Sequence, residues 1–299
     1  MTSIVAQVCR TPSWPWPVVL VWTLLGCHTA PAVPERLPSS LAALGRRAAG
    51  ERIPLEHAVL FVPRGYRIPV DRPVPVHVHF QGGTVIAEEN FVRMQRDGVL
   101  LASTLSGRSG AFAAPYRDPR KFVALLDSAG RALSQRAGQP VVLGELVITF
   151  FSAGYGAVRE LLALPALFAR IRALVSADSI YASVVAEGVR APRAEQMVDF
   201  QRFAQAAARG EKTFVLAHGL YRTPYASTAE CADSILAAVA ARRVPVRAFT
   251  ERGVPIAAEA HVGGFHLYTF AEATPGIHVD CLYMIPELVR RHVSAAQIP

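Results

Sequence analysis

The sequence predicts an α/β fold with a mainly parallel sheet and helices on both faces. Three observations lead to this prediction. Short runs of β-branched and apolar residues alternate with segments of helical periodicity. Several of these runs end at a serine, aspartate or histidine, at the position where a buried parallel strand reaches the edge of its sheet. The 299 residues, of which 52% are hydrophobic, suit one large domain or a domain with a small appendage.

The elements follow from the hydrophobic pattern in chain order. Strands are predicted at 58–62, 74–80, 99–103, 147–151, 173–177, 212–217 and 265–270. Helices are predicted at 118–136, 156–170, 193–209, 227–241 and 278–293. The segments 183–200 and 251–264 are candidate covers of a binding pocket. No internal repeat interrupts this alternation.

The N-terminus has the features of an export signal. Arg10 precedes an apolar run from Pro17 to Gly26, which is too short to span a bilayer comfortably but suits the core of a signal peptide. The run ends in Leu24-Leu25-Gly26-Cys27, which resembles the bacterial lipobox, where the cysteine is diacylated and becomes the new N-terminus. We therefore expect a signal peptide at 1–26, a tether at 27–52 and one domain at 53–299. Ordinary secretion, a retained anchor and a chance match stay open as alternatives.

If the lipobox is real, the protein is exported and held at a membrane by lipid on Cys27, in the periplasm or facing the outer membrane. The net charge of +8 adds little to this location. The cationic residues are almost all arginines spread along the chain, since Lys121 and Lys212 are the only lysines. No basic run is long enough for a nucleic-acid tract, so no nucleic-acid partner is predicted. A mild attraction to anionic lipid stays open.

The cysteines indicate no metal site. Cys9 would leave with the signal peptide and Cys27 would carry lipid, so Cys231 and Cys281 remain in the domain. The two could form a disulfide in an oxidising compartment, or they could be separate buried thiols. No CxxC motif or Cys/His spacing is typical of a metal site, and no cofactor is predicted.

The most informative segment is 146–160. An apolar strand ends at Phe151, Ser152 follows, and Ala153-Gly154 leads into a helix. A serine at a sharp turn between strand and helix is the arrangement of a nucleophile elbow. Elbows have small residues two positions before and after the nucleophile, and here the first of these positions is Phe150. The frame centred on Tyr155 has small residues at both ends, but tyrosine is a poor nucleophile for acyl transfer.

Ser152, Asp178 and His278 form a possible catalytic triad. Each follows a predicted strand, and the carboxyl ends of parallel strands meet at one edge of a sheet. Asp178 could instead cap a helix, because Ser179 and Tyr181 follow it. His278 could be an ordinary histidine in the first turn of a helix.

The other histidines have alternative roles. His261 and His266 are the next candidates for the base, and His218 is expected to be structural or to line the pocket. His77 and His79 are two positions apart on one strand and share a face. His79 is closer to the loop and could line the pocket, whereas His77 is expected in the core.

From about residue 55 to the end, the chain resembles α/β-hydrolase-fold proteins. That family has its nucleophile, acid and histidine in the chain order Ser, Asp/Glu, His. The resemblance implies that Ala153 supplies one oxyanion-hole amide. It implies that Gly82 or Gly83 supplies the second amide, because His79-Phe80-Gln81-Gly82-Gly83 is similar to the family's HGGG loop. The family more often carries its acid one strand later than Asp178.

The expected activity is hydrolysis of an ester or amide through an acyl-enzyme at the cell envelope. The substrate could be a small molecule or a polymer. Two alternatives stay open. One is a non-catalytic α/β-hydrolase-like lipoprotein that binds a ligand, which Phe150 in the elbow favours. The other is a structural lipoprotein whose pocket has lost its function.

Overall fold

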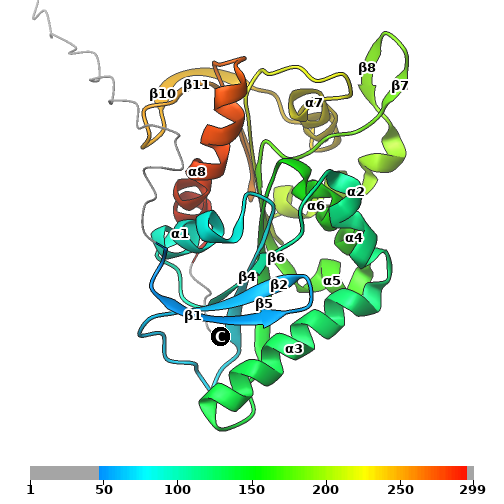
Figure 1. The fold of residues 1–299 in the computed structure, drawn as a ribbon. Coiled ribbons are helices and arrows are strands. Elements are labelled where there is room, and N and C mark those ends of the chain that lie inside the picture. The colour runs from blue at the N-terminus through cyan, green and yellow to red at the C-terminus, as the bar shows by residue number, and fades with distance from the viewer. Residues whose placement is uncertain (1–46, 295–299) are drawn as a thin grey trace, which may run out of the picture. The chain divides into compact units, whose positions relative to one another are not determined.

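A computed structural model describes residues 47–294 of the chain, and these form ten strands of one large sheet with helices packed on it (Figure 1). The predicted signal peptide and Cys27 lie outside the described residues. The sheet has the order β1-β2-β4-β3-β5-β6-β9-β12-β11-β10. Its strands are β1 (Gly50–Leu55), β2 (Ala58–Pro63), β3 (Val74–Phe80), β4 (Val99–Ser103), β5 (Leu143–Phe151), β6 (Ile171–Ala177), β9 (Thr213–His218), β10 (Val244–Phe249), β11 (Pro255–Val262) and β12 (Phe265–Phe270).

The six central strands of this order, β4-β3-β5-β6-β9-β12, run parallel to one another. At each end two further strands are added by antiparallel pairing, β2 and β1 beside β4, and β11 and β10 beside β12. The central strands are buried on both faces, which explains their nearly continuous apolar sequences. The fold class predicted from the sequence is confirmed: an α/β fold, mainly parallel, with helices on both faces. Ser152, Asp178 and the loop after Phe80 all follow the carboxyl ends of central strands.

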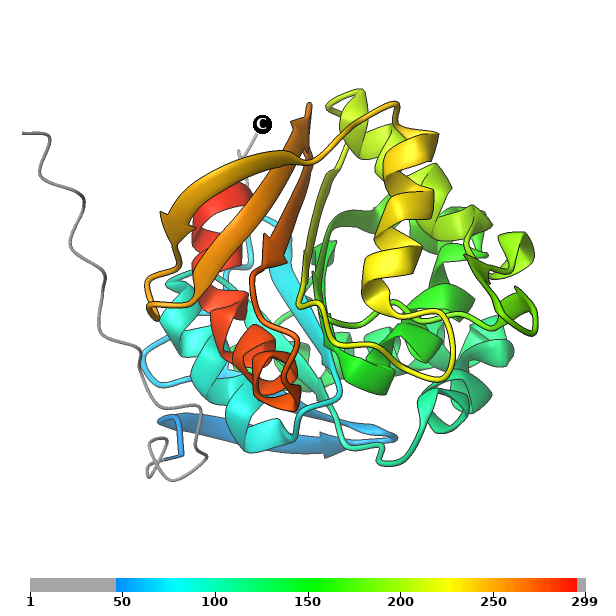
Figure 2. The ribbon, with the colours of Figure 1, turned by 90° about the horizontal axis from the view of Figure 1, so that it is seen from above.

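Two helices cover one face of the sheet, and the others cover the opposite face. The helices are α1 (Thr84–Met94), α2 (Ser109–Ala113), α3 (Pro119–Ala137), α4 (Tyr155–Leu162), α5 (Pro165–Arg170), α6 (Val198–Ala208), α7 (Thr228–Ala238) and α8 (Pro275–His292). Figure 2 shows α8 (red) and α1 (cyan) on one face and α7 (yellow) on the other. Each face has its own apolar core, one built with α1 and α8 and one with α2 to α7.

The two cysteines of the described domain are free and lie on opposite faces of the sheet. Cys231 belongs to the core under α7, and Cys281 belongs to the core under α8. Because the sheet separates them, the structure favours two separate buried thiols over a disulfide. Burial raises the pKa of both thiols, so each is a neutral packing group at neutral pH.

Helix α8 contains Pro286, which has no backbone N–H to donate to the carbonyl of Leu282 four residues earlier. Asn90 of α1 supplies the missing donor, with its side-chain nitrogen 2.8 Å from that oxygen. Both groups are buried, so an unpaired carbonyl there would be costly. The contact therefore joins α1 to α8 at the point where α8 loses its own hydrogen bond.

Several elements differ from the sequence prediction. The predicted helix 156–170 is two helices, because Leu164 adopts an extended conformation before Pro165. Of the two candidate pocket covers, the first contains a small hairpin, β7 (Val184–Ala186) with β8 (Val189–Pro192), and the start of α6. The second contains β11, which belongs to the main sheet. Among residues 47–294, no helix is both long and apolar enough to cross a membrane.

Candidate functional site

Ser152 lies at a strained turn between β5 and α4. Its φ angle is +50°, in the left-handed region that non-glycine residues seldom adopt, and it begins a short 3₁₀ turn, Ser152–Gly154, that leads into α4. The first amides of such a helix have no partner within the helix. The local backbone therefore has the geometry predicted for a nucleophile elbow, with the serine at its apex.

The elbow closes against β3 and not against Phe150. A Cβ atom on Gly154 would lie 2.5 Å from the carbonyl oxygen of Phe80, so only glycine fits this position. Phe150 is fully buried on the α6 face of the sheet, where its ring stacks on Phe200 with centroids 6.4 Å apart. The large residue at the first small position is therefore accommodated because its side chain packs on Phe200 in the core, while Gly154 meets Phe80.

Asp178 and His278 are paired. The Nδ1 nitrogen of His278 lies 2.7 Å from Oδ2 of Asp178, and the aspartate side chain is 7% exposed. The bond fixes the imidazole with its proton on Nδ1 and leaves Nε2 as the free nitrogen. The imidazole also packs on the ring of Phe151, the residue before Ser152, with centroids 4.5 Å apart. The His278 imidazole and the Asp178 carboxylate therefore lie beside the elbow.

No hydrogen bond joins the Ser152 hydroxyl to His278 among the described residues, although the sequence prediction placed the two groups in or near hydrogen-bond reach. Catalytic hydrogen bonds are often long in unliganded sites and shorten when substrate binds. What holds Ser152 near the pair is its backbone, since Ser179 Oγ donates a 2.7 Å hydrogen bond to the Ser152 carbonyl.

Ser179 and Tyr181 are parts of the site that the sequence did not reveal. No helix follows Asp178, so the capping role considered for it has no helix to cap. Instead Asp178 has a φ angle of +44°, and its N–H donates to the carbonyl of Ala217. The hydroxyl of Tyr181 donates to the Asp178 carbonyl at 3.0 Å and lies 3.5 Å from Nδ1 of His278. Burial, with the nearby Asp178 charge, raises the pKa of Tyr181, so it stays a neutral donor.

The loop between β3 and α1 is the candidate oxyanion loop. Gln81, Gly82 and Gly83 have consecutive positive φ angles of 72°, 104° and 86°. A Cβ on Gly82 would lie 3.0 Å from the methyl carbons of Leu282 on α8, so the loop packs directly on the helix that carries His278. The loop lies between a central strand and the helix that follows it. In the family that the sequence resembles, the loop that supplies the second oxyanion donor has the same position.

Backbone strain gathers at this edge of the sheet. Six non-glycine residues of the described chain have a positive φ, and three of them are Gln81, Ser152 and Asp178. Each such residue costs on the order of 1–3 kcal/mol and persists only where its surroundings enforce it. The three strained residues come from three different strand ends, so the strain marks one shared site.

The sheet order, the elbow after a central parallel strand and the chain order of Ser152, Asp178 and His278 together decide the fold type. It is an α/β-hydrolase fold.

No family model and no curated protein matches the chain. Among solved structures, the chain is similar to poly(aspartic acid) hydrolase-1 from Sphingomonas sp. KT-1, at 11% identity over 82% of this chain and 99% of that chain, with a TM-score of 0.44. It is also similar to a mutant feruloyl esterase module from Clostridium thermocellum complexed with sinapinate, at 12% identity over 89% and 98% of the two chains, with a TM-score of 0.47. The assignment of the α/β-hydrolase fold rests on the chain's own topology and not on these likenesses.

The alternative candidate histidines make their contacts away from Ser152. His261 and His266, the alternative bases, lie where β12 begins, at the amino-terminal edge of the parallel strands, opposite Ser152. Their Nδ1 atoms are 3.0 Å apart, and His261 also contacts Glu259. His218 is fully buried and makes hydrogen bonds with the Gly219 carbonyl and with Thr269, which fits a structural role.

His77 and His79 are both buried in β3, on the α1 face of the sheet. His77 packs on Phe91 with centroids 4.9 Å apart. His79 bonds through Nδ1 to the hydroxyl of Thr149 at 2.8 Å, and its Nε2 would lie 3.5 Å from a Cβ atom on Gly82. Burial lowers the pKa of each imidazole to about 4, so both are neutral at neutral pH. His79 therefore lies against the candidate oxyanion loop at Gly82.

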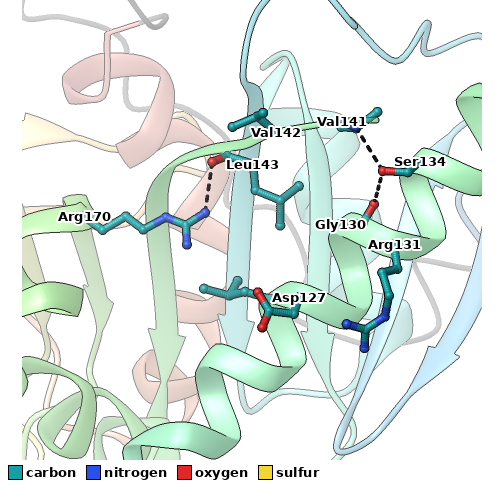
Figure 3. Close-up of a pocket in the computed structure, with 9 residues that line it drawn as sticks. Asp127, Gly130, Arg131, Ser134, Val141, Val142, Leu143 and Arg170 are labelled. Atoms are coloured by element: carbon teal, nitrogen blue, oxygen red, sulfur yellow. Dashed lines mark hydrogen bonds between the residues drawn. The ribbon is translucent and has the colours of Figure 1, made fainter. Parts of the chain in front are cut away.

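A pocket of about 490 Å³ lies away from the triad, between α3 and the start of β5 (Figure 3). Several of its polar groups are paired within the protein. Arg170 donates to the carbonyls of Leu143 and Gly144, and Ser134 bonds to Gly130 and to Val141. The pocket opens at the amino-terminal end of β5, whereas Ser152 follows the carboxyl end of that strand. No cluster of described residues is arranged to hold a metal ion.

Proposed function

We propose that the protein is a serine hydrolase that cleaves an ester or amide bond through an acyl-enzyme. The observation that supports this most is the 2.7 Å pairing of His278 with Asp178 beside a serine in a strained left-handed turn. A histidine–aspartate pair with a purely structural role does not require a strained serine beside it. The hydrolase fold and the chain order of the three residues support the same activity.

The proposed mechanism has two steps. Nε2 of His278 takes the proton of Ser152 while the serine oxygen attacks the carbonyl carbon, and Asp178 stabilises the imidazolium that forms. The amides of Ala153 and of Gly82 or Gly83 stabilise the negative oxygen. The alcohol or amine then leaves with the proton from His278, and water repeats the sequence on the acyl-enzyme to release the acid. Each amide donor in an oxyanion hole increases the rate by a factor of roughly 10²–10³.

The decisive experiment is labelling with a fluorophosphonate. We expect the wild type to be labelled on Ser152, Ser152→Ala to remain unlabelled, and Ser106→Ala, which removes an exposed serine from the loop after β4, to be labelled like the wild type. The readout is intact mass, followed by peptide mapping. An unlabelled wild type with a native melting transition would instead favour the non-catalytic ligand-binding protein. The missing hydrogen bond between Ser152 and His278 is the observation that keeps this second function open.

We further propose that the hydrolase works at the cell envelope, attached through lipid on Cys27. The support is the sequence Leu24-Leu25-Gly26-Cys27 after an apolar run. In a bacterial host, the mature protein is expected to partition into detergent and to begin at Cys27 with added acyl mass, whereas Cys27→Ser is expected to remain unprocessed. A mature protein that stays in solution without detergent and begins at another residue would refute the lipid anchor. The proposed hydrolase chemistry would be unaffected.

A further inference from the structure

Three tyrosine rings form a row at the edge of the sheet that carries the triad. The rings of Tyr155 and Tyr181 have centroids 5.6 Å apart, and those of Tyr181 and Tyr225 are 5.5 Å apart and perpendicular. Tyr155 begins α4 after β5, Tyr181 follows β6, and Tyr225 lies in the loop after β9. The row therefore draws one ring from the carboxyl end of each of three neighbouring strands, where α/β folds bind their ligands.

The row begins beside the reacting groups. The Tyr181 hydroxyl contacts the Asp178 carbonyl and lies 3.5 Å from the His278 imidazole. Tyr155 is three residues after Ser152, in the first turn of the helix that the elbow starts. A group bound on these rings would therefore lie next to the bond that Ser152 attacks.

The inner part of the row is held rigidly. The guanidinium carbon of Arg159 lies 5.1 Å from the centre of the Tyr155 ring, and Arg159 Nη2 donates to the Tyr181 carbonyl at 2.9 Å. The Tyr155 hydroxyl donates to Ser109 Oγ at 3.0 Å. Rings that are already fixed lose little conformational freedom when a ligand binds, so they are effective contact surfaces.

The outer end of the row is open. Tyr181 is 8% exposed, whereas Tyr225 is 47% exposed although its ring already packs on Tyr181. The exposed part of this ring offers an aromatic surface beside Tyr181, which itself contacts His278 and Asp178. Aromatic rings prefer offset-stacked or edge-to-face partners at 4.5–7 Å, which adds about 0.5–1.5 kcal/mol beyond the burial of area.

We propose that Tyr155, Tyr181 and Tyr225 form a subsite for a flat aromatic group, so that the substrate is an ester with an aromatic ring beside its scissile bond. The proposal rests on the proposed serine hydrolase activity and adds the substrate class to it. A saturated ring has a similar apolar area but lacks the ring quadrupole, so the tyrosine row is expected to discriminate between the two.

The test compares esters that differ only in ring type. One pair is methyl 3-phenylpropanoate and methyl 3-cyclohexylpropanoate, with the ring on the acyl side. The other is 2-phenylethyl acetate and 2-cyclohexylethyl acetate, with the ring on the alcohol side. In at least one pair, the wild type is expected to favour the aromatic ester by about three- to tenfold in kcat/KM. Tyr225→Ala should bring that ratio close to one, and Tyr225→Phe should keep it.

Tyr221→Ala is the matched control. Tyr221 lies in the same loop and is 41% exposed, but its ring makes no aromatic contact with the row among the described residues. This variant is expected to keep both the rate and the ratio of the wild type. Equal rates on both esters of each pair, or a ratio that Tyr225→Ala leaves unchanged, would overturn the subsite while the hydrolase activity stands.

Loss of the proposed function is recognised separately, by absent ester hydrolysis together with absent fluorophosphonate labelling. In that case ligand-observed NMR decides the subsite without catalysis. Line broadening of 3-phenylpropanoate that exceeds that of 3-cyclohexylpropanoate, and that disappears in Tyr225→Ala, would support the aromatic subsite. Equal broadening of the two acids would refute it.

Discussion

The hydroxyl of Ser179 donates a 2.7 Å hydrogen bond to the backbone carbonyl of Ser152. It joins two strained turns, because Ser152 and the neighbouring Asp178 both have positive φ angles. Ser179 is fully buried, so its hydroxyl is shielded from water. The elbow and the loop that carries Asp178 are therefore held together.

Ser179→Ala should reduce kcat about fivefold and change KM little, because the loss of one buried hydrogen bond, about 1 kcal/mol, loosens the position of Ser152 without removing a group that touches substrate. The readouts are the separate kcat and KM values and the rate of labelling by a fluorophosphonate. Ser176→Ala is the matched control, since its buried hydroxyl has no hydrogen-bond partner in the described chain. Equal effects of the two substitutions would show that Ser179 has no positioning role.

Asp178→Asn should lower kcat by roughly 10⁴, since an amide no longer fixes the proton of His278 on Nδ1. The fold should persist, as followed by circular dichroism and the melting temperature. Asp127→Asn, at the opposite edge of the sheet beside the pocket of Figure 3, should leave kcat unchanged. If activity survives in Asp178→Asn while the melting temperature falls, Asp178 serves only the structure.

Gly154→Ala should destabilise the domain by about 1–3 kcal/mol and abolish labelling of Ser152, because the new methyl group collides with backbone and not with a flexible side chain. The clash is with the Phe80 carbonyl, 2.5 Å from the Cβ position. Gly110→Ala provides the comparison, since nothing lies within 4 Å of its Cβ position. Urea unfolding and labelling measure the two effects, and normal labelling of Gly154→Ala would contradict the elbow geometry.

Acid should destabilise the protein partly through His77. Burial lowers the pKa of His77 to about 4, chiefly by desolvation, against an ordinary value of 6.5. Between these two values the unfolded chain binds the proton and the folded chain does not, so the stabilising contribution is complete above pH 6.5 and is lost as the pH falls. One such group accounts for about 2 kcal/mol between pH 7.5 and pH 5.

His77→Phe keeps a ring against Phe91 and removes the titrating group. Its free energy of unfolding should therefore change less between pH 7.5 and pH 5 than that of the wild type, by about the same 2 kcal/mol. His57→Asn, which replaces a partly exposed histidine, should keep the wild-type difference. Parallel pH dependence in the wild type and His77→Phe would show that other groups cause the acid sensitivity.

The central strands and the order of Ser152, Asp178 and His278 could be predicted because buried parallel strands have nearly continuous apolar sequences that end abruptly at polar residues. The outer strands β1, β10 and β11 were missed. Their residues are partly exposed, β10 contains Pro245, and β11 is rich in alanine, so neither strand propensity nor alternation marks them. Helix α1 was missed because Gly83 begins it without a capping side chain.

The roles of Ser179 and Tyr181 could not be predicted for a different reason. Asp followed by Ser is also typical of a helix N-terminus, and only the left-handed conformation of Asp178 distinguishes the two cases. Likewise, Phe150 counted against an elbow until the structure showed that its side chain points into the core under α6. Backbone conformation and side-chain direction at these turns depend on contacts between distant segments, which a local pattern does not contain.

The hydrogen bond from Asn90 to the Leu282 carbonyl links two parts of the proposed machinery. Helix α1 follows directly from the oxyanion loop, and α8 carries His278 one turn before Leu282, whose side chain touches Gly82. The hydrogen bond and this contact hold α1 and the loop before it against α8, so the packing of two helices sets the distance between Gly82 and His278. The carbonyl that Pro286 leaves without a helical donor is thus the group through which α1 is joined to α8.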